Sequence, residues 1–232
     1  AINAGINASN SELITLLDDD DTWHSQYLEK TVTALDRKVH PNIRGAVCRT
    51  LCIEESSVEK GLKVERTYEL NPDLCHLTLG SLAVVNRFCT HAFLYERAAL
   101  ETVGRYPEDY PVLEDWHFNL RFLLHHEIMV VPEILTNYHF RPPEPSGAQA
   151  NSQIAERNDH KFHEARLINE AMREDLKNGK PGLGSVLVQA AMVREINEAL
   201  HRHESRLKTI SEKNGRIDAR TKELKDKLIK RP

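Results

Sequence analysis

Apolar and polar residues alternate with two different periods along the first 142 residues, which predicts a mixture of strands and helices. The apolar run Leu13–Leu17 has the length and β-branching of a buried strand. Apolar residues at helical spacing predict amphipathic helices over Trp23–Asp36 and Glu114–His125. The other predicted elements are a helix at 1–10, a strand at 43–53, a charged turn at 54–61, strands at 62–70, 88–95, 128–131 and 132–142, and a helix at 96–103 that ends at Gly104. This set of elements predicts an α/β fold.

The second part of the chain has a different pattern. A linker is expected at 143–151, followed by a helical region at 152–185 that Asn178–Gly182 interrupts. Over 186–232, apolar or small polar residues recur at alternating steps of three and four, a heptad pattern held for about five repeats. Asn214 falls at an a position, where a buried Asn typically selects a parallel dimer, so a coiled-coil homodimer is expected. The alternative is a helical hairpin, because Asn214 and Gly215 also form a turn dipeptide.

Four consecutive aspartates, Asp18–Asp21, follow the first predicted strand. Adjacent carboxylates repel one another, so a fold accepts them where a cation binds or where they extend into water. Alternate residues of an extended chain point the same way, and Asp18 and Asp20 could therefore converge on one hard cation. In open α/β sheets, ligands lie at the carboxyl ends of the strands, where these residues are expected. The alternative is a solvated acidic turn that caps the next helix.

Charge is distributed unevenly along the 232 residues. The net charge of −4 gives no reason to expect nucleic acid as a partner. Residues 186–232 carry 12 Lys and Arg against 7 Asp and Glu, a net charge of +5, whereas the preceding residues carry a net charge of −9. An acidic body with a basic tail suggests two functional units, and the tail is expected to allow peripheral contact with an anionic membrane face.

The compartment is expected to be the cytoplasm. The four cysteines form no Cys-x-x-Cys pair and are expected to be free thiols in a reducing environment. No apolar run approaches the length of a membrane span. Ala1–Ile6 reads like the middle of a helix inside a domain, so further residues are expected upstream.

Several sequence blocks occur in an order that is more specific than any one of them. They are Ala1–Ile6, Leu16–Trp23, Phe93–Tyr106, Glu114–Arg121 and Val131–Leu135. Together they resemble family 2 glycosyltransferases with the GT-A fold, over about residues 1–142. The family's first strands, which grip the nucleotide base, would then precede Ala1.

The resemblance implies a donor site and a metal. The family holds a nucleotide-diphosphate sugar, here expected to be UDP-linked, through Mn²⁺ or Mg²⁺ on an Asp-x-Asp motif. By resemblance, Asp18 would face the nucleoside, Asp20 would bind the metal, and Asn3 would contact the donor. Arg141 would touch the diphosphate and His139 would complete the metal ligands, although both could instead be solvent-facing residues at a strand end.

The resemblance also assigns catalytic residues. The family's acidic pair maps to Glu114 and Asp115, and the general base to Asp115, which would deprotonate the acceptor hydroxyl in a single inverting displacement. If the other sequence blocks were absent, the simpler interpretation of Glu114 and Asp115 would be favourable pairing of their charge with the helix dipole. Arg121 could hold this pair or be a surface charge, and His91 could line the sugar pocket or be a packed core histidine.

The predicted function is sugar transfer to a glycan or lipid-linked acceptor in the synthesis of a surface polysaccharide. One alternative is a non-catalytic scaffold, in which a degenerate transferase domain presents the coiled coil. Another is a nucleotidyltransferase, which would need a basic triphosphate-binding loop that this sequence does not contain.

Overall fold

The computed structural model describes residues 1–58, 61–141 and 157–229. The chain divides into two compact units, Ala1–Val188 and Gln189–Pro232. The predicted linker at 143–151 lies outside the described residues. None of the helices in the described ranges combines the length and apolar character needed to cross a membrane.

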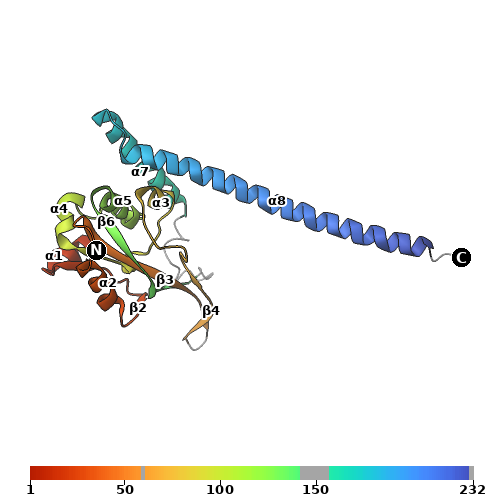
Figure 1. Ribbon diagram of the computed structural model, residues 1–232, viewed down its shortest axis with the longest axis horizontal. Helices are drawn as coiled ribbons and strands as arrows, with labels where there is room; N and C mark the ends of the chain where they lie inside the picture. The colour runs from red at the N-terminus through yellow and green to blue at the C-terminus, as the bar shows by residue number, and fades with distance from the viewer. Residues whose placement is uncertain (59–60, 142–156, 230–232) are drawn as a thin grey trace. The chain divides into compact units, whose positions relative to one another are not determined.

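A six-stranded sheet forms the centre of the first unit (Figure 1). The strands are β1 (Leu13–Thr15), β2 (Thr22–Trp23), β3 (Ile43–Val58), β4 (Gly61–Glu69), β5 (Phe93–Glu96) and β6 (Glu127–Phe140). Their order is β1-β5-β3-β6-β2, and β4 extends β3 as a hairpin. The two longest strands, β3 and β6, run parallel, whereas every other pairing in the described sheet is antiparallel. This mixed α/β architecture confirms the predicted fold class.

The helices of the first unit are mostly short. They are α1 (Ile2–Ala8), α2 (Tyr27–Asp36), α3 (Leu79–Val84), α4 (Leu100–Val103), α5 (Glu114–His125) and α7 (Arg157–Asn178), with single 3₁₀ turns η1 (Thr90–Ala92) and η2 (Arg97–Ala99). The helix α8 (Leu183–Ile229) begins in the first unit and continues through the second. Gly104 ends α4 as expected, with a φ of 80° that favours glycine.

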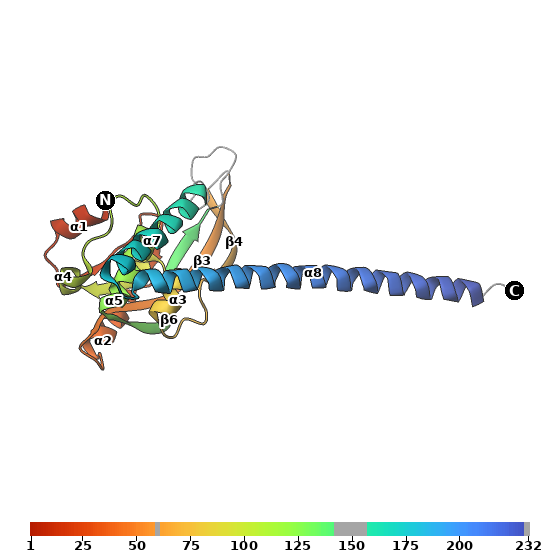
Figure 2. The same ribbon diagram turned by 90° about the horizontal axis from the view of Figure 1, so that it is seen from above.

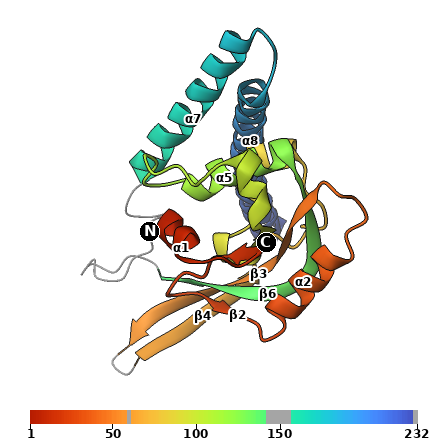
Figure 3. The ribbon, with the colours of Figure 1, turned by 90° about the vertical axis from the view of Figure 1, so that its left-hand side faces the viewer.

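Side-chain alternation on β5 explains why helices cover both faces of the sheet (Figure 3). Leu94 packs in a cluster with Leu35 of α2. Its neighbours Phe93 and Tyr95 point to the opposite face, where their rings lie 5.1 Å and 5.9 Å from that of Phe122 of α5. The strand is therefore buried on both sides, and it fixes the segment that precedes it, η1, inside the domain.

Several predicted boundaries are wrong. The helix expected from Trp23 begins at Tyr27, because Trp23 pairs with β6 as part of β2. The first strand is only three residues long and Leu17 is 48% exposed, so the run is not fully buried. The expected charged turn at 54–61 belongs mostly to β3, the strand expected at 88–95 begins at Phe93, and the two strands expected at 128–142 form one strand, β6.

The helix α8 is continuous in the structure (Figures 1 and 2). It passes through Asn214 and Gly215 without a turn, so the helical hairpin is not formed. Most apolar heptad residues of the second unit are exposed, among them Val193, Ile196, Leu200, Leu207, Ile210 and Ile217. The four cysteines are free, as expected.

Candidate active site

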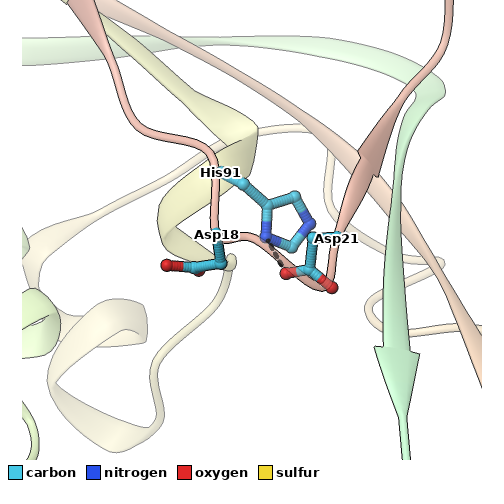
Figure 4. A group of neighbouring side chains, drawn as sticks. All are labelled: Asp18, Asp21 and His91. Atoms are coloured by element: carbon cyan, nitrogen blue, oxygen red, sulfur yellow. Dashed lines mark ion pairs between the residues drawn. The ribbon is translucent and has the colours of Figure 1, made fainter.

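The loop between β1 and β2 carries the four aspartates and meets η1 at its buried end (Figure 4). Nδ1 of His91 lies 2.7 Å from Oδ2 of Asp21, and both side chains are almost fully buried. The other oxygen of Asp21 accepts a hydrogen bond from the backbone N–H of His139 at 2.9 Å. Asp21 is therefore held between η1 and β6, and it is not the helix cap considered from the sequence.

Asp18, Asp21 and His91 form a group that could hold a metal ion. One ligand atom from each lies within 4.8 Å of the others. Nε2 of His91 is buried and has no hydrogen-bond partner among the described residues. Nδ1 of His91 faces Oδ2 of Asp21, so a cation shared by these two residues would take the place of the proton between them. Two carboxylates and an imidazole suit Mn²⁺, so these residues fit the cation that the sequence predicts.

The electrostatics of Asp18 also favour a cation. Burial raises the pKa of Asp18 and the charge of Asp21 raises it further, His91 lowers it, and the charges of Asp20 and Asp115 add smaller increases. A positive charge that binds beside such a carboxylate stabilises its charged form, which its neighbours destabilise. The repulsion expected from the run of aspartates is thus present around Asp18.

Glu114 and Asp115 occupy the first turn of α5, as predicted. Oδ2 of Asp115 accepts hydrogen bonds from Nδ2 of Asn86 at 2.8 Å and from the hydroxyl of Thr90 at 3.5 Å. Oδ1 accepts from the backbone N–H of Trp116 at 2.6 Å. Burial raises the pKa of Asp115 and outweighs these hydrogen bonds, which lower it. A carboxylate with a raised pKa is better suited to proton abstraction than an ordinary surface aspartate.

The 3₁₀ turn η1 joins the two acidic groups. Thr90 contacts Asp115, and the next residue, His91, contacts Asp21. The charge of Asp115 is near enough to raise the pKa of Asp18, and Asp18 in turn raises that of Glu114. The structure therefore brings the two acidic segments, almost a hundred residues apart in sequence, to one place.

The basic residues expected at the donor lie at the end of β6. Nε of Arg141 donates to Oε2 of Glu55 at 3.3 Å, and its Nη1 lies 3.9 Å from Oδ2 of Asp20. The Asp20 side chain is 36% exposed. Arg141 and Asp20 are thus neighbours at the solvent side of the loop that carries the four aspartates.

His139 is not placed as a metal ligand. Its Nδ1 lies 3.0 Å from Oε1 of Glu55, and its Nε2 lies 3.1 Å from the hydroxyl of Thr22. Both ring nitrogens of His139 are thus engaged within the protein, and the histidine in the group of three candidate ligands is His91. Asp20 likewise lies outside the group of three candidate ligands, where Asp21 takes its place.

Asn3 and Arg121 are both directed toward the segment that precedes α5. Nδ2 of Asn3 donates to the carbonyl of Tyr106 and to Glu108, each at 2.9 Å, and its Oδ1 accepts from the N–H of Tyr106. Arg121 donates to the carbonyls of Val103, at 3.0 Å, and Arg105. The donor contact expected at Asn3 stays a prediction, and these hydrogen bonds of Arg121 go to backbone carbonyls and not to the acidic pair.

Thr90 and Asn86 are site residues that the sequence did not reveal. Neither has a distinctive motif, and both reach Asp115 only because the segment before β5 passes beside the start of α5. His91 was recognisable only as a histidine before a predicted strand.

Comparisons with known proteins found one family model and a similar solved structure. Residues 1–104 match the family model described as "Glycosyl transferase family 2". Among solved structures, the chain is similar to one described as "Crystal structure of S. aureus TarS 1-349 in complex with UDP-GlcNAc". The identity is 15% and the TM-score 0.42, with 72% of this chain and 45% of that chain covered, so this chain spans less than half of that protein. No curated protein matches the sequence.

Proposed function

We infer that this chain, whose residues 1–104 match the family model of glycosyl transferase family 2, transfers a sugar from a nucleotide-diphosphate donor to an acceptor hydroxyl. The observation that carries the proposal is the junction at η1, where Thr90 meets Asp115 and His91 meets Asp21. A transferase needs a cation beside the leaving diphosphate and a base beside the attacking hydroxyl. The junction places residues suited to both tasks next to each other.

Asp18, Asp21 and His91 would hold Mn²⁺ or Mg²⁺. When bound, the cation would neutralise charge on the diphosphate of the donor. Arg141 offers a positive charge on the solvent side of the same loop, where Asp20 lies. Arg141 would there bind a donor phosphate oxygen, since a guanidinium suits phosphate geometry.

Asp115 would act as the general base. Asn86 and Thr90 hold Oδ2 of its carboxylate by donating to it, which leaves further lone pairs for an acceptor hydroxyl. One positioned base contributes roughly 10²–10⁴ in rate. A single displacement by the deprotonated hydroxyl would invert the anomeric configuration. Glu114, whose pKa burial also raises, would border the acceptor side.

The wider context of the reaction follows from the resemblance. The proposed donor is UDP-linked, the acceptor a glycan or lipid-linked sugar, and the pathway the synthesis of a surface polysaccharide in the cytoplasm. The second unit would join two copies through α8, and its net positive charge would favour contact with an anionic membrane face.

Nucleotide release tests this proposal. The chain is incubated with a panel of nucleotide sugars and MnCl₂, and the freed nucleoside diphosphate is measured, with water or added sugars as acceptor. We expect turnover with at least one donor, loss of turnover in Asp115→Asn with donor binding retained, and normal turnover in Asp36→Asn, which changes an exposed aspartate of α2. Unchanged turnover in Asp115→Asn would refute the assignment of the base. A full-length wild type that is inactive with every donor would favour the scaffold alternative.

A further inference from the structure

The segment between α4 and α5 leads directly into Glu114 and Asp115, yet it contains no helix or strand. Its last residue, Leu113, has φ 64° and ψ 14° and is the only non-glycine residue with a positive φ in the described chain. The left-handed conformation costs an L-residue roughly 1–2 kcal/mol. Such a conformation persists where the surrounding structure fixes it, and it occurs often at functional sites.

The end of the segment that lies nearer Asp115 is held by α7. Nη1 of Arg166 donates to the carbonyl of Asp109 at 2.9 Å, and Nη2 pairs with the Asp109 carboxylate. The guanidinium carbon lies 4.4 Å from the centre of the Tyr110 ring, and the hydroxyl of Tyr110 donates to Oε2 of Glu170 at 2.6 Å. Nε of Arg166 donates to the other oxygen of Glu170 at 2.8 Å. These four residues form a closed ring of contacts, which we call the α7 clamp.

The α7 clamp differs from an ordinary surface ion pair. Isolated exposed pairs contribute little, with a median of about 0–1 kcal/mol. Here one guanidinium makes contacts through all three nitrogens and stacks on an aromatic ring, which a lysine could not do. Tyr110 is only 4% exposed, and its ring also lies 5.0 Å from that of His117 on α5. The clamp thus joins α7, the segment and α5.

The opposite end of the segment is anchored independently. Asn3 holds Tyr106 and Glu108, and Arg121 holds the carbonyls of Val103 and Arg105. Between these anchors and Glu114, residues 109 and 110 are restrained from outside the segment by side chains of α7 and α5. Loss of the clamp would therefore release the part of the segment next to Leu113.

We propose that Arg166, Tyr110 and Glu170 are positioning residues, through which α7 fixes the strained entry to α5 and hence the place of Asp115. This inference rests on the proposed function. If the clamp opens, Leu113 can relax to a negative φ, which reorients the first turn of α5 and moves Asp115 away from Asn86 and Thr90. A displacement of about 1 Å in a reacting group can cost 10²-fold in rate.

The test compares Arg166→Ala with Arg173→Ala, which removes an exposed arginine of the same helix. Hydrogen exchange and steady-state kinetics are measured on the full chain. In Arg166→Ala we expect faster exchange of backbone amides at 109–116, a kcat lower by about 10- to 100-fold and a donor KM within about threefold of wild type. Arg173→Ala should match the wild type in amide exchange, kcat and donor KM. Arg166→Lys, which keeps the charge but not the forked contacts, should restore less than half of the lost kcat.

A double-mutant cycle separates the clamp from general loss of stability. Asp109→Ala and Arg166→Ala together should lower kcat no more than Arg166→Ala alone, because both remove one interaction. The inference would be overturned if the losses of kcat in the double-mutant cycle were additive. It would also be overturned if Arg166→Ala left the exchange at 109–116 unchanged, or if it made this exchange faster while kcat stayed within twofold of wild type. If the wild type shows no turnover, the proposed function fails, and the exchange of residues 113–116 alone then decides whether α7 fixes the start of α5.

Discussion

Nδ1 of His91 lies 2.7 Å from Oδ2 of Asp21, in a pair of side chains that are 1% and 2% exposed. Breaking a buried pair by removing one partner is expensive, because the other polar group stays buried without compensation. The same two residues belong to the group of three that could hold a metal ion. One contact therefore connects the stability of the acidic loop with its proposed use as a metal site.

The first prediction concerns His91. His91→Ala should raise the Mn²⁺ concentration needed for half-maximal turnover by about 10- to 100-fold, since loss of metal-site partners has effects of this size. The measurement is a Mn²⁺ titration of nucleotide release. His125→Ala, an exposed histidine at the end of α5, is the control and should behave like the wild type. If His91→Ala and His125→Ala needed the same Mn²⁺ concentration, the assignment of His91 as a metal ligand would be wrong.

The second prediction separates two adjacent aspartates. Asp21→Asn disrupts the buried pair and should lower the free energy of unfolding by about 3–5 kcal/mol, which denaturant unfolding can measure. Asp20→Asn changes a side chain that is 36% exposed and lies 3.9 Å from Arg141, so it should cost less than about 1 kcal/mol. If Asp20→Asn proved the more destabilising of the two, the described arrangement of the loop would be wrong.

Part of the fold could be predicted from the sequence, where the signals are local. The bounds of α5 agree at both ends with those expected, because its apolar period and its acidic first turn are local signals. The two-residue strand β2 exists only by pairing with β6, more than 110 residues further along, so the local apolar pattern assigned Trp23 to a helix. A local pattern contains no information about such distant pairing.

The group of candidate metal ligands in the structure differs from the expected one for a similar reason. His91 and His139 both lie near strands, and the resemblance gave the metal to His139. The pairing of β1 with β5 brings the segment before β5 to the acidic loop, whereas His139 faces Glu55 on β3. Likewise Asp21, and not Asp20, turns inward because its second oxygen accepts from the backbone of β6. Both distinctions depend on tertiary contacts.

The third prediction uses the pKa of Asp115. A general base works when deprotonated, so kcat/KM should fall as the pH drops through the pKa of Asp115, which burial raises above 3.8. Asn86 donates to the carboxylate and stabilises its charged form. Asn86→Ala should therefore raise this pKa further and move the acid limb of the pH profile to higher pH. Asn178→Ala, at the exposed end of α7, is the control and should leave the limb in place. A limb that moved to lower pH in Asn86→Ala would exclude Asp115 as the group responsible.

The last prediction concerns α8. Leu207 and Ile210 are 65% and 53% exposed in a single chain, and they belong to a row of apolar residues at heptad spacing. An uninterrupted helix with such a row can bury it against a second copy, and residues at a and d positions carry most of that stability. Ile210→Asp should therefore shift the sedimentation coefficient from that of a dimer to that of a monomer. Lys208→Asp, which places the same carboxylate outside the row and changes the net charge even more, should leave the dimer intact. A wild type that sediments as a monomer at high micromolar concentration would reject the proposed coiled-coil dimer and leave the assignment of the active site unaffected.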